Sequence, residues 1–477
     1  SRVRKYAYFA NVDLAYKDYL FLNLTGRNEW VSFLDKDNNS YFYPSAGISF
    51  VPTKAFESLK DNKVLSYAKV MFSVVKVGNA DIGAYEINNL YRQSTGYPFN
   101  GVNSYVPNVQ PTIAYNSRTN PYIKPEFYVS KEATINLGFL NDRITLEASG
   151  YISDNTDLIT SVSSSYASGN PNYVTNIGAT KAKGIEIDLG ITPIKTKDFT
   201  WEAKFSFSKT KTTVEKVSDN TNSVAIYSPY GTYGIFAEEG EEYPIIKGFG
   251  YQRDGEGRII VDANTGNPLK STELMKLGKT TPDYILGLNT SIDFKGLRLA
   301  AVMDYRTGHQ YYSGTKNTLS SFGYLVDSAE NGRNGFIMPN SSYLDTATGT
   351  YVANNSVVTG GGSSTGIQQY YANTYSNIDE NYILDATAFK VRELALSYAI
   401  PSKMLERTGL TSLRVGVNAR NPFTVLAREN RGYDDPEGSI NNGNAVGLAS
   451  GTSSSGANGT NQYPNTRTIG FSLNLTF

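Results

Sequence analysis

The chain has 477 residues, with 44 basic and 44 acidic side chains, one histidine and no cysteine. The absence of cysteine excludes disulfides and thiol nucleophiles. The single histidine excludes multi-histidine metal sites and histidine-based triads. The balanced charge gives no reason to expect a nucleic-acid partner. No apolar run approaches the ~18 residues of a spanning helix, which excludes a helical membrane bundle. The composition of 36 Tyr, 22 Phe and 43 Gly with only 18% charged residues favours a β protein that meets lipid.

Polarity alternates with a period of two over segments of roughly ten residues, the length of a tilted membrane-spanning strand. In the first hairpin, pairing Tyr16 with Leu20 across a short turn puts the apolar residues of both strands on one face. The same agreement of faces recurs in residues 133–139 with 144–152, 185–191 with 199–207, 286–294 with 297–305, and 394–400 with 413–419. With segments 41–51, 64–77 and 468–477, the pattern predicts about thirteen strands.

Charged side chains collect on the opposite face of these strands. They are Glu132, Glu147, Glu186, Asp188, Glu202, Lys204, Asp293, Arg298, Asp304 and Arg414. In a membrane barrel they would line the lumen, because a charge facing lipid costs ~2–4 kcal/mol at the midplane. In a soluble sandwich they would face water and the apolar face would meet a second sheet. The alternation alone fits both architectures.

The connectors decide between the two. Short turns alternate with long connectors rich in Gly, Ser, Asn and Tyr, at residues 78–125, 153–183, 210–281, 306–381 and 421–465. Outer-membrane barrels have short turns on one rim and long loops on the other, whereas loops of this length are uncommon in compact soluble domains. The sequence therefore predicts an all-β fold, a transmembrane antiparallel β-barrel with short periplasmic turns and long extracellular loops.

The strand count also predicts how much of a barrel is present. Bacterial single-chain barrels have an even number of strands, so an odd count that ends in a regular strand predicts further strands before Ser1. We expect residues 1–477 to form the C-terminal part of a larger barrel, with the N-terminal plug domain absent from this chain.

Short motifs along the chain resemble one known family in their order and spacing. The motifs are Ile123-Lys124-Pro125-Glu126, Leu140-Asn141-Asp142-Arg143, Lys183-Gly184-Ile185-Glu186, Asp304-Tyr305-Arg306-Thr307-Gly308, Phe389-Lys390-Val391-Arg392-Glu393-Leu394, Asn418-Ala419-Arg420-Asn421-Pro422-Phe423, Gly432-Tyr433-Asp434-Asp435-Pro436-Glu437 and the terminal Phe477. Together they resemble the SusC/RagA-type TonB-dependent outer-membrane transporters of Bacteroidetes.

The resemblance implies a barrel of about 22 strands with a plugged lumen, in the bacterial outer membrane. It implies a SusD-like surface lipoprotein over the extracellular loops, in a dimer of such transporter–lipoprotein pairs, and energy supplied by the TonB complex through the missing N-terminal part. The implied function is active import of oligomeric nutrients, either oligosaccharides or oligopeptides. The alternative is a passive porin or structural barrel without energy coupling.

Within this framework the charged residues of the polar face are expected to contact the plug or to line the substrate path. Tyr311, Tyr312, Tyr370 and Tyr371 are expected either to contact substrate or the lipoprotein, or to pack the loops against one another. The resemblance also implies that Phe471 and Phe477, in the final strand, are a signal for the barrel-assembly machinery, with a simple aromatic-girdle residue as the alternative for Phe477.

Other motifs give weak signals. The segment 262–267 faintly resembles a calcium loop but lacks the Glu ligand, so a β-turn is favoured. His309 is expected to be an ordinary surface residue, and the acidic run 238–242 a solvated loop. No enzyme activity, cofactor or metal site is predicted, since the chain offers no clustered acid, base and nucleophile.

Overall fold

A computed structural model describes residues 2–60, 62–80, 82–89, 91–93, 98–99, 102–103, 111–113, 117–163, 172–218, 221–227, 233–430, 432–433, 435–437 and 466–477. The chain forms two compact units. One comprises residues 1–193, 206–226 and 237–242, and the other comprises residues 194–205, 227–236 and 243–477.

Among the described residues, the largest element is a 13-stranded sheet with the order β1-β2-β3-β4-β10-β11-β14-β15-β21-β22-β27-β28-β29. Its first strands are β1 (Lys5–Tyr16), β2 (Leu20–Val31), β3 (Ser40–Phe50), β4 (Leu65–Asn79), β10 (Glu126–Phe139), β11 (Ile144–Thr156), β14 (Ala179–Lys195) and β15 (Phe199–Lys216). They continue with β21 (Tyr284–Phe294), β22 (Leu297–Thr307), β27 (Ala388–Ala399), β28 (Ser412–Leu426) and β29 (Thr468–Thr476). The sequence-based strand count is confirmed for this part of the chain, including the two segments around residues 41–51 and 64–77.

The pairing register confirms the predicted faces. Tyr16 pairs with Leu20, Leu137 with Leu146, Leu288 with Met303, and Val417 with Phe471. Because side chains alternate along a strand, each of these pairs extends one apolar face of the sheet. Many large apolar side chains on this face are exposed, for example Ile135 and Ile185 at 44% and 53%.

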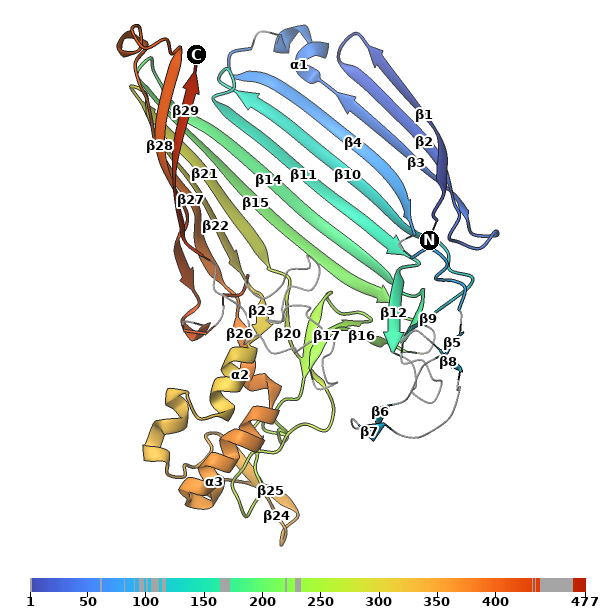
Figure 1. Cartoon of the computed structure of the whole chain (residues 1–477), viewed down its shortest axis with the longest axis vertical. Helices are drawn as coiled ribbons and strands as arrows, with labels where there is room; N and C mark the ends of the chain where they lie inside the picture. The colour runs from blue at the N-terminus through green and yellow to red at the C-terminus, as the bar shows by residue number, and fades with distance from the viewer. Residues whose placement is uncertain are drawn as a thin grey trace. The chain divides into compact units, whose positions relative to one another are not determined.

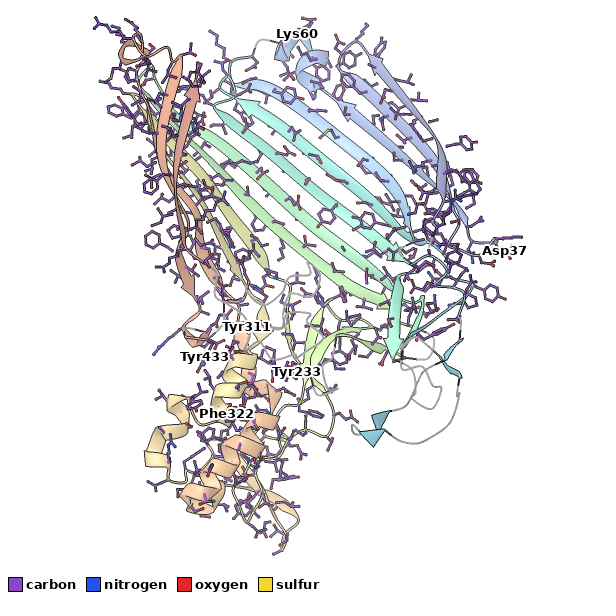
Figure 2. The ribbon with its side chains drawn as sticks, viewed as in Figure 1. Asp37, Lys60, Tyr233, Tyr311, Phe322 and Tyr433 are labelled. Atoms are coloured by element: carbon purple, nitrogen blue, oxygen red, sulfur yellow. The ribbon has the colours of Figure 1, made fainter. Side chains whose placement is uncertain are left out.

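Connectors leave the sheet of the first unit at two opposite ends. The connector between β3 and β4, with helix α1 (Pro52–Ala55) and Lys60, lies at one end of the strands, and Asp37 between β2 and β3 lies at the other (Figure 2). The strands between them run side by side in Figure 1. No helix in the described ranges is both long and apolar enough to cross a membrane.

The second unit adds a folded assembly of loops to its strands. It contains α2 (Gly314–Ser321), α3 (Ser364–Gln369), β18 (Ile245–Gly248), β19 (Ile259–Ile260), β20 (Met275–Lys279), β23 (Gln310–Tyr312), β24 (Ser341–Asp345), β25 (Thr350–Ala353) and β26 (Ile383–Asp385), with most of β17 (Gly234–Glu238). Pairs such as Tyr311 with Leu384 and Ile246 with Gly278 join segments far apart in sequence. These long connectors therefore carry a core of their own.

In the first unit, one buried apolar cluster lies beside the loop ends of β2 and β3. It consists of Val31, Phe33, Leu34, Tyr41, Ala80 and Ile123. The core of the second unit lies mainly in its loop assembly, where Ile235, Ile246, Ile378 and Tyr382 are fully buried.

Candidate functional site

Three segments far apart in sequence meet in an ionic network at the loop ends of β22 and β27. Asp304 on β22 lies directly opposite Lys390 on β27 in the strand register. The ammonium of Lys390 donates to both carboxylate oxygens of Asp435, at 2.6 and 2.8 Å, and to Glu437 at 2.9 Å. The side chain of Lys390 is only 2% exposed. The segment 435–437 is therefore attached to the strands through a buried ion pair.

Two arginines complete the network. Arg392 donates to both Asp304 and Glu437. Arg306 lies 3.2 Å from Asp304 and 3.2 Å from Glu437. Three cations thus face three carboxylates, so each buried charge has a partner and the cost of removing it from water is offset. Burial raises the pKa of the Glu437 carboxyl, but hydrogen bonds from Arg392 and Lys390 outweigh it and lower that pKa to about 2.

A β-bulge accounts for the direction of Arg392. Along β27, strict alternation would put Arg392 on the apolar face with Leu394 and Leu396. The register instead shifts between Val391 and Glu393 against β28, and between Val302 and Met303 against β22. A bulge re-aims one side chain, and here it directs the guanidinium to the polar face. The sequence motifs contain all six residues of the network, but alternation gave a role to Asp304 alone.

Tyrosines form the core of the loop assembly in the second unit. The rings of Tyr233 and Tyr312 are stacked with centroids 3.8 Å apart, and Tyr382 meets Tyr312 edge-on at 5.9 Å. Tyr370 and Tyr375 lie 5.8 Å apart. Burial raises the pKa of the Tyr370 and Tyr382 hydroxyls well above the ordinary range, so these groups act as neutral packing and hydrogen-bonding side chains.

A buried carboxyl lies beside this aromatic core. Asp379 is 4% exposed, and its side chain accepts a hydrogen bond from the backbone N–H of Phe249 at 2.8 Å. Burial raises the pKa of Asp379 to about 6. The adjacent Glu380 accepts from the backbone N–H of Tyr251 and from Arg253, at 3.0 and 2.7 Å. The acidic pair therefore fastens residues 249–253 to the loop that precedes β26.

The tyrosines predicted as contact residues are mostly buried. Tyr311, Tyr312 and Tyr370 are 1%, 4% and 2% exposed. Tyr311 donates its hydroxyl to Asn430. These three residues pack loops against one another, and their contact with substrate or lipoprotein stays a prediction. Tyr371 is partly exposed and donates its hydroxyl to the backbone oxygen of Asp327 at 2.8 Å.

His309 is also placed differently from the prediction. It is 5% exposed rather than on the surface, and burial lowers its pKa to about 4. Its backbone oxygen accepts from Ala386 at 2.9 Å, because the segments around β23 and β26 fold over it. The burial of a single histidine in a loop leaves no local periodic pattern in the sequence from which it could be predicted.

The predicted luminal charges share the polar face within each unit. In the first unit, register places Glu147 opposite Asp188, and Ser206 donates to the Asp188 carboxylate. In the second unit, Arg298 lies 3.1 Å from Asp293. The remaining members fall on this face by register or alternation: Glu132, Glu186, Glu202, Lys204, Asp304 and Arg414. Contact of these side chains with a plug or a substrate stays a prediction.

The calcium-like segment forms a turn. Asp262 accepts from the backbone N–H groups of Asn264 and Thr265 at 3.0 and 2.7 Å, which is the arrangement expected of a side-chain-capped turn. Within the described ranges, no group of three or more His, Cys, Asp or Glu side chains could hold a metal ion. Phe471 and Phe477 are 84% and 87% exposed at the final strand, and their assembly role stays a prediction.

Comparison with known proteins finds related outer-membrane receptors and a similar solved structure. The chain is 23% identical to TonB-dependent receptor P3 of Formosa agariphila, over 98% of this chain and 45% of that protein. It is 24% identical to TonB-dependent receptor SusC of Bacteroides thetaiotaomicron, over 61% of this chain and 30% of that one. The structure of the RagAB peptide transporter superposes with a TM-score of 0.71 at 20% identity, covering 100% of this chain and 48% of that chain.

The chain thus spans less than half the length of these relatives, and the resemblance to SusC/RagA-type transporters is confirmed. The family described as TonB dependent receptor-like, beta-barrel matches residues 1–304, which is more than half of the chain. The chain therefore belongs to the TonB-dependent receptor β-barrel family, a family of outer-membrane receptors and not of enzymes, and its antiparallel sheet is part of an outer-membrane barrel.

Proposed function

We propose that this chain forms the C-terminal part of the barrel of an active importer that takes up oligomeric nutrients, oligosaccharides or oligopeptides, with energy from the TonB complex. The observation that carries the proposal is membership of the TonB-dependent receptor family, matched over residues 1–304. The names of its relatives support the import of oligomeric nutrients, since one relative is named SusC and another is a peptide transporter.

The proposed protein is longer than this chain. The relatives are about twice its length, which supports the interpretation that residues 1–477 are the C-terminal part of a barrel whose plug lies in a preceding segment. The TonB complex would act on that segment. In such an arrangement the polar face of the sheet is the surface that a plug would meet, and paired charges such as Arg298 with Asp293 suit contacts that must form and release.

A surface lipoprotein of the SusD type is the proposed partner, with the complex forming a dimer of transporter–lipoprotein pairs. The loop assembly offers a contact surface for it. Phe322, Tyr324 and Val326 follow helix α2 and are 72%, 77% and 80% exposed, and Figure 2 shows Phe322 on the α2 side of the assembly. Exposed aromatic side chains that cluster in this way are typical of protein interfaces.

The partner proposal is tested by copurification. We expect the double variant Phe322→Ala with Tyr324→Ala to lose the lipoprotein from the affinity-purified complex. Tyr122→Ala is the matched control, because Tyr122 is 68% exposed but lies in the other unit. Full recovery of lipoprotein with the double variant, or an equal loss with the control, would contradict the proposed contact.

Energy coupling is tested by uptake. Cells that express the intact protein should accumulate a labelled oligosaccharide or oligopeptide, and an uncoupler of the proton gradient should abolish the accumulation. Uptake that continues unchanged with the uncoupler would identify a passive porin instead. Mass spectrometry of ligands that remain bound through purification would decide between glycan and peptide cargo.

A further inference from the structure

The lipid-facing surface of the first unit carries lysines where alternation predicts apolar residues. Lys131 on β10 and Lys183 on β14 flank Ile152 of β11 in one row of the sheet. This row continues through Val74, Ala46, Leu24 and Val12 on the apolar face. Lys76 on β4 pairs with Val129 in the next row on the same face.

These lysines form a compact cationic group. Lys76 and Lys131 are diagonal neighbours on adjacent strands, which places their Cβ atoms about 7–8 Å apart. Lys131 and Lys183 are separated by one strand, or roughly 10 Å. Within the described residues, no carboxylate pairs with Lys131 or Lys183, both of which are exposed. The nearby Asp154 is engaged by Lys181 at 3.4 Å.

The depth of the lysines follows from strand geometry. At about 3.3 Å per residue, Lys131 lies about 26 Å along its strand from the turn residue Phe139, or roughly 20 Å above the periplasmic turn at the usual barrel tilt. The apolar band of an outer-membrane barrel is about 25 Å tall. The lysines therefore lie in its upper part, where flexible stems can carry their ammonium groups to the headgroups of the outer leaflet.

Aromatic residues on β1 and its neighbours lie at the two edges of this apolar band. Tyr6 stacks on Trp30 at 5.1 Å near one end of the strands, and Tyr16 meets Tyr19 edge-on at 5.6 Å at the other. Tyr and Trp gather at the two membrane interfaces, and about 33 Å of tilted strand between Tyr6 and Tyr16 spans a height near 25 Å.

An apolar groove lies beside the lysines on this face. It has a volume of about 470 Å³ and is lined by Ala10, Val12, Leu24, Gly26, Pro44, Ala46 and Val74, with Lys76 at its edge. Small side chains on three neighbouring strands open the groove between bulkier ones. Val12 lies about 13 Å along its strand from Tyr16, so this part of the groove is nearer the membrane midplane than Lys131.

We propose that the groove and Lys76, Lys131 and Lys183 together bind one anionic, phosphate-bearing acyl lipid of the outer leaflet. The phosphate contacts the ammonium groups at headgroup depth, and an acyl chain runs down the groove. The ammonium of Lys76 lies 3.9 Å from the centroid of the Phe127 ring, which leaves it free to accept a phosphate as well. A phosphate pairs the charges of Lys131 and Lys183, which would otherwise face the edge of the hydrocarbon, and it does so where lipid phosphates are concentrated.

Native mass spectrometry of the intact protein in mild detergent tests the headgroup contact, with phosphatidylglycerol as the probe. We expect the double variant Lys131→Gln with Lys183→Gln to weaken binding by about fivefold for each lysine, to the level of zwitterionic phosphatidylcholine. Lys69→Gln should change nothing, because Lys69 of β4 lies on the polar face opposite Asn136. Equal affinity of the double variant and the parent, or an equal loss with Lys69→Gln, would overturn the proposal.

A second pair of variants tests the acyl groove. Ala46→Phe should fill it and lower the affinity for phosphatidylglycerol severalfold, whereas Ala148→Phe, on the same face but outside the groove, should not. Competition by inorganic phosphate separates the lipid from a simple anion site: it should fail to displace the lipid at millimolar concentration. Displacement by phosphate alone, or equal effects of the two phenylalanine variants, would rule out a lipid site.

Discussion

The ammonium of Lys390 donates hydrogen bonds to both oxygens of Asp435, at 2.6 and 2.8 Å, and so joins strand β27 to a segment that follows β28. Lys390 is almost completely buried. Removal of one partner from a buried pair leaves the other charge without compensation, which costs more than the pair itself contributes. The pair therefore fixes the path of residues 435–437 more than it adds to the stability of the barrel.

Lys390→Met should release this segment. We expect a loss of about 3–5 kcal/mol from the local structure, because Asp435 and Glu437 would keep their charges without the ammonium. Limited proteolysis should then cut near residues 432–437, while the β strands remain folded. Lys403→Met is the control, since Lys403 is exposed in the connector between β27 and β28. An unchanged cleavage pattern in Lys390→Met would contradict the anchoring role.

Arg392→Lys should also fail to preserve the network. A guanidinium can engage Asp304 and Glu437 at once through its planar fork, whereas an ammonium is a single point donor. We expect a loss of about 1–3 kcal/mol for a charge-assisted hydrogen bond, measured as a lower midpoint of thermal unfolding. The control is Arg407→Lys, an exposed arginine near Lys403. Equal midpoints for the parent and Arg392→Lys would show that positive charge alone suffices.

The hairpins could be predicted because their physics is local. A strand alternates with a period of two, and a short turn fixes which residues face each other, so Leu137 opposite Leu146 follows from the sequence. At every short connector the apolar faces of the two flanking strands can be checked for agreement, and the strands found in this way can be counted. The alternation of short and long connectors then favours a barrel over a sandwich, and membership of the TonB-dependent receptor β-barrel family confirms the barrel.

The candidate site was less predictable because long-range packing sets it. Arg392 breaks the alternation, and only the bulge seen in the pairing of β27 explains why its charge avoids the apolar face. Tyr311 and Tyr312 lie in a polar connector that looks exposed, yet strand β26, far along the chain, covers them. A segment's periodicity contains no information about a partner that distant.

Asp379 should make the loop assembly less stable as the pH rises. Its pKa is about 6 in the folded protein against an ordinary value of 3.8, so the folded state binds the proton more tightly than the unfolded state. The resulting stabilisation is complete below pH 3.8 and is lost as the pH rises through about 6. Hydrogen exchange at the Phe249 amide, which donates to Asp379, should therefore be faster at pH 7 than at pH 5 after correction for the intrinsic rate.

Asp379→Asn isolates this effect. An amide keeps an acceptor for the Phe249 N–H but does not titrate. The difference between variant and parent in the exchange rate of the Phe249 amide should therefore grow between pH 4 and pH 6. His309 acts in the opposite direction, because its lowered pKa destabilises the fold as the pH falls below 6.5. Comparison of variant with parent at each pH cancels that contribution. A constant difference across the range would show that Asp379 does not titrate there.

The assignment of the sheet faces to lipid and lumen can be tested by moving a charge between them. Ile187 and Asp188 are neighbours on β14, with Ile187 opposite Ala148 on the apolar face and Asp188 opposite Glu147 on the polar face. Ile187→Arg should cost about 2–4 kcal/mol near the midplane and lower the yield of folded barrel in the outer membrane, measured by heat-modifiable electrophoretic mobility. Asp188→Ala loses a hydrogen bond from Ser206 but places no charge in lipid, so its yield should stay near that of the parent. Leu288→Arg and Asn289→Ala on β21 repeat the comparison in the other unit, and equal yields within both pairs would mean that the apolar face does not meet hydrocarbon.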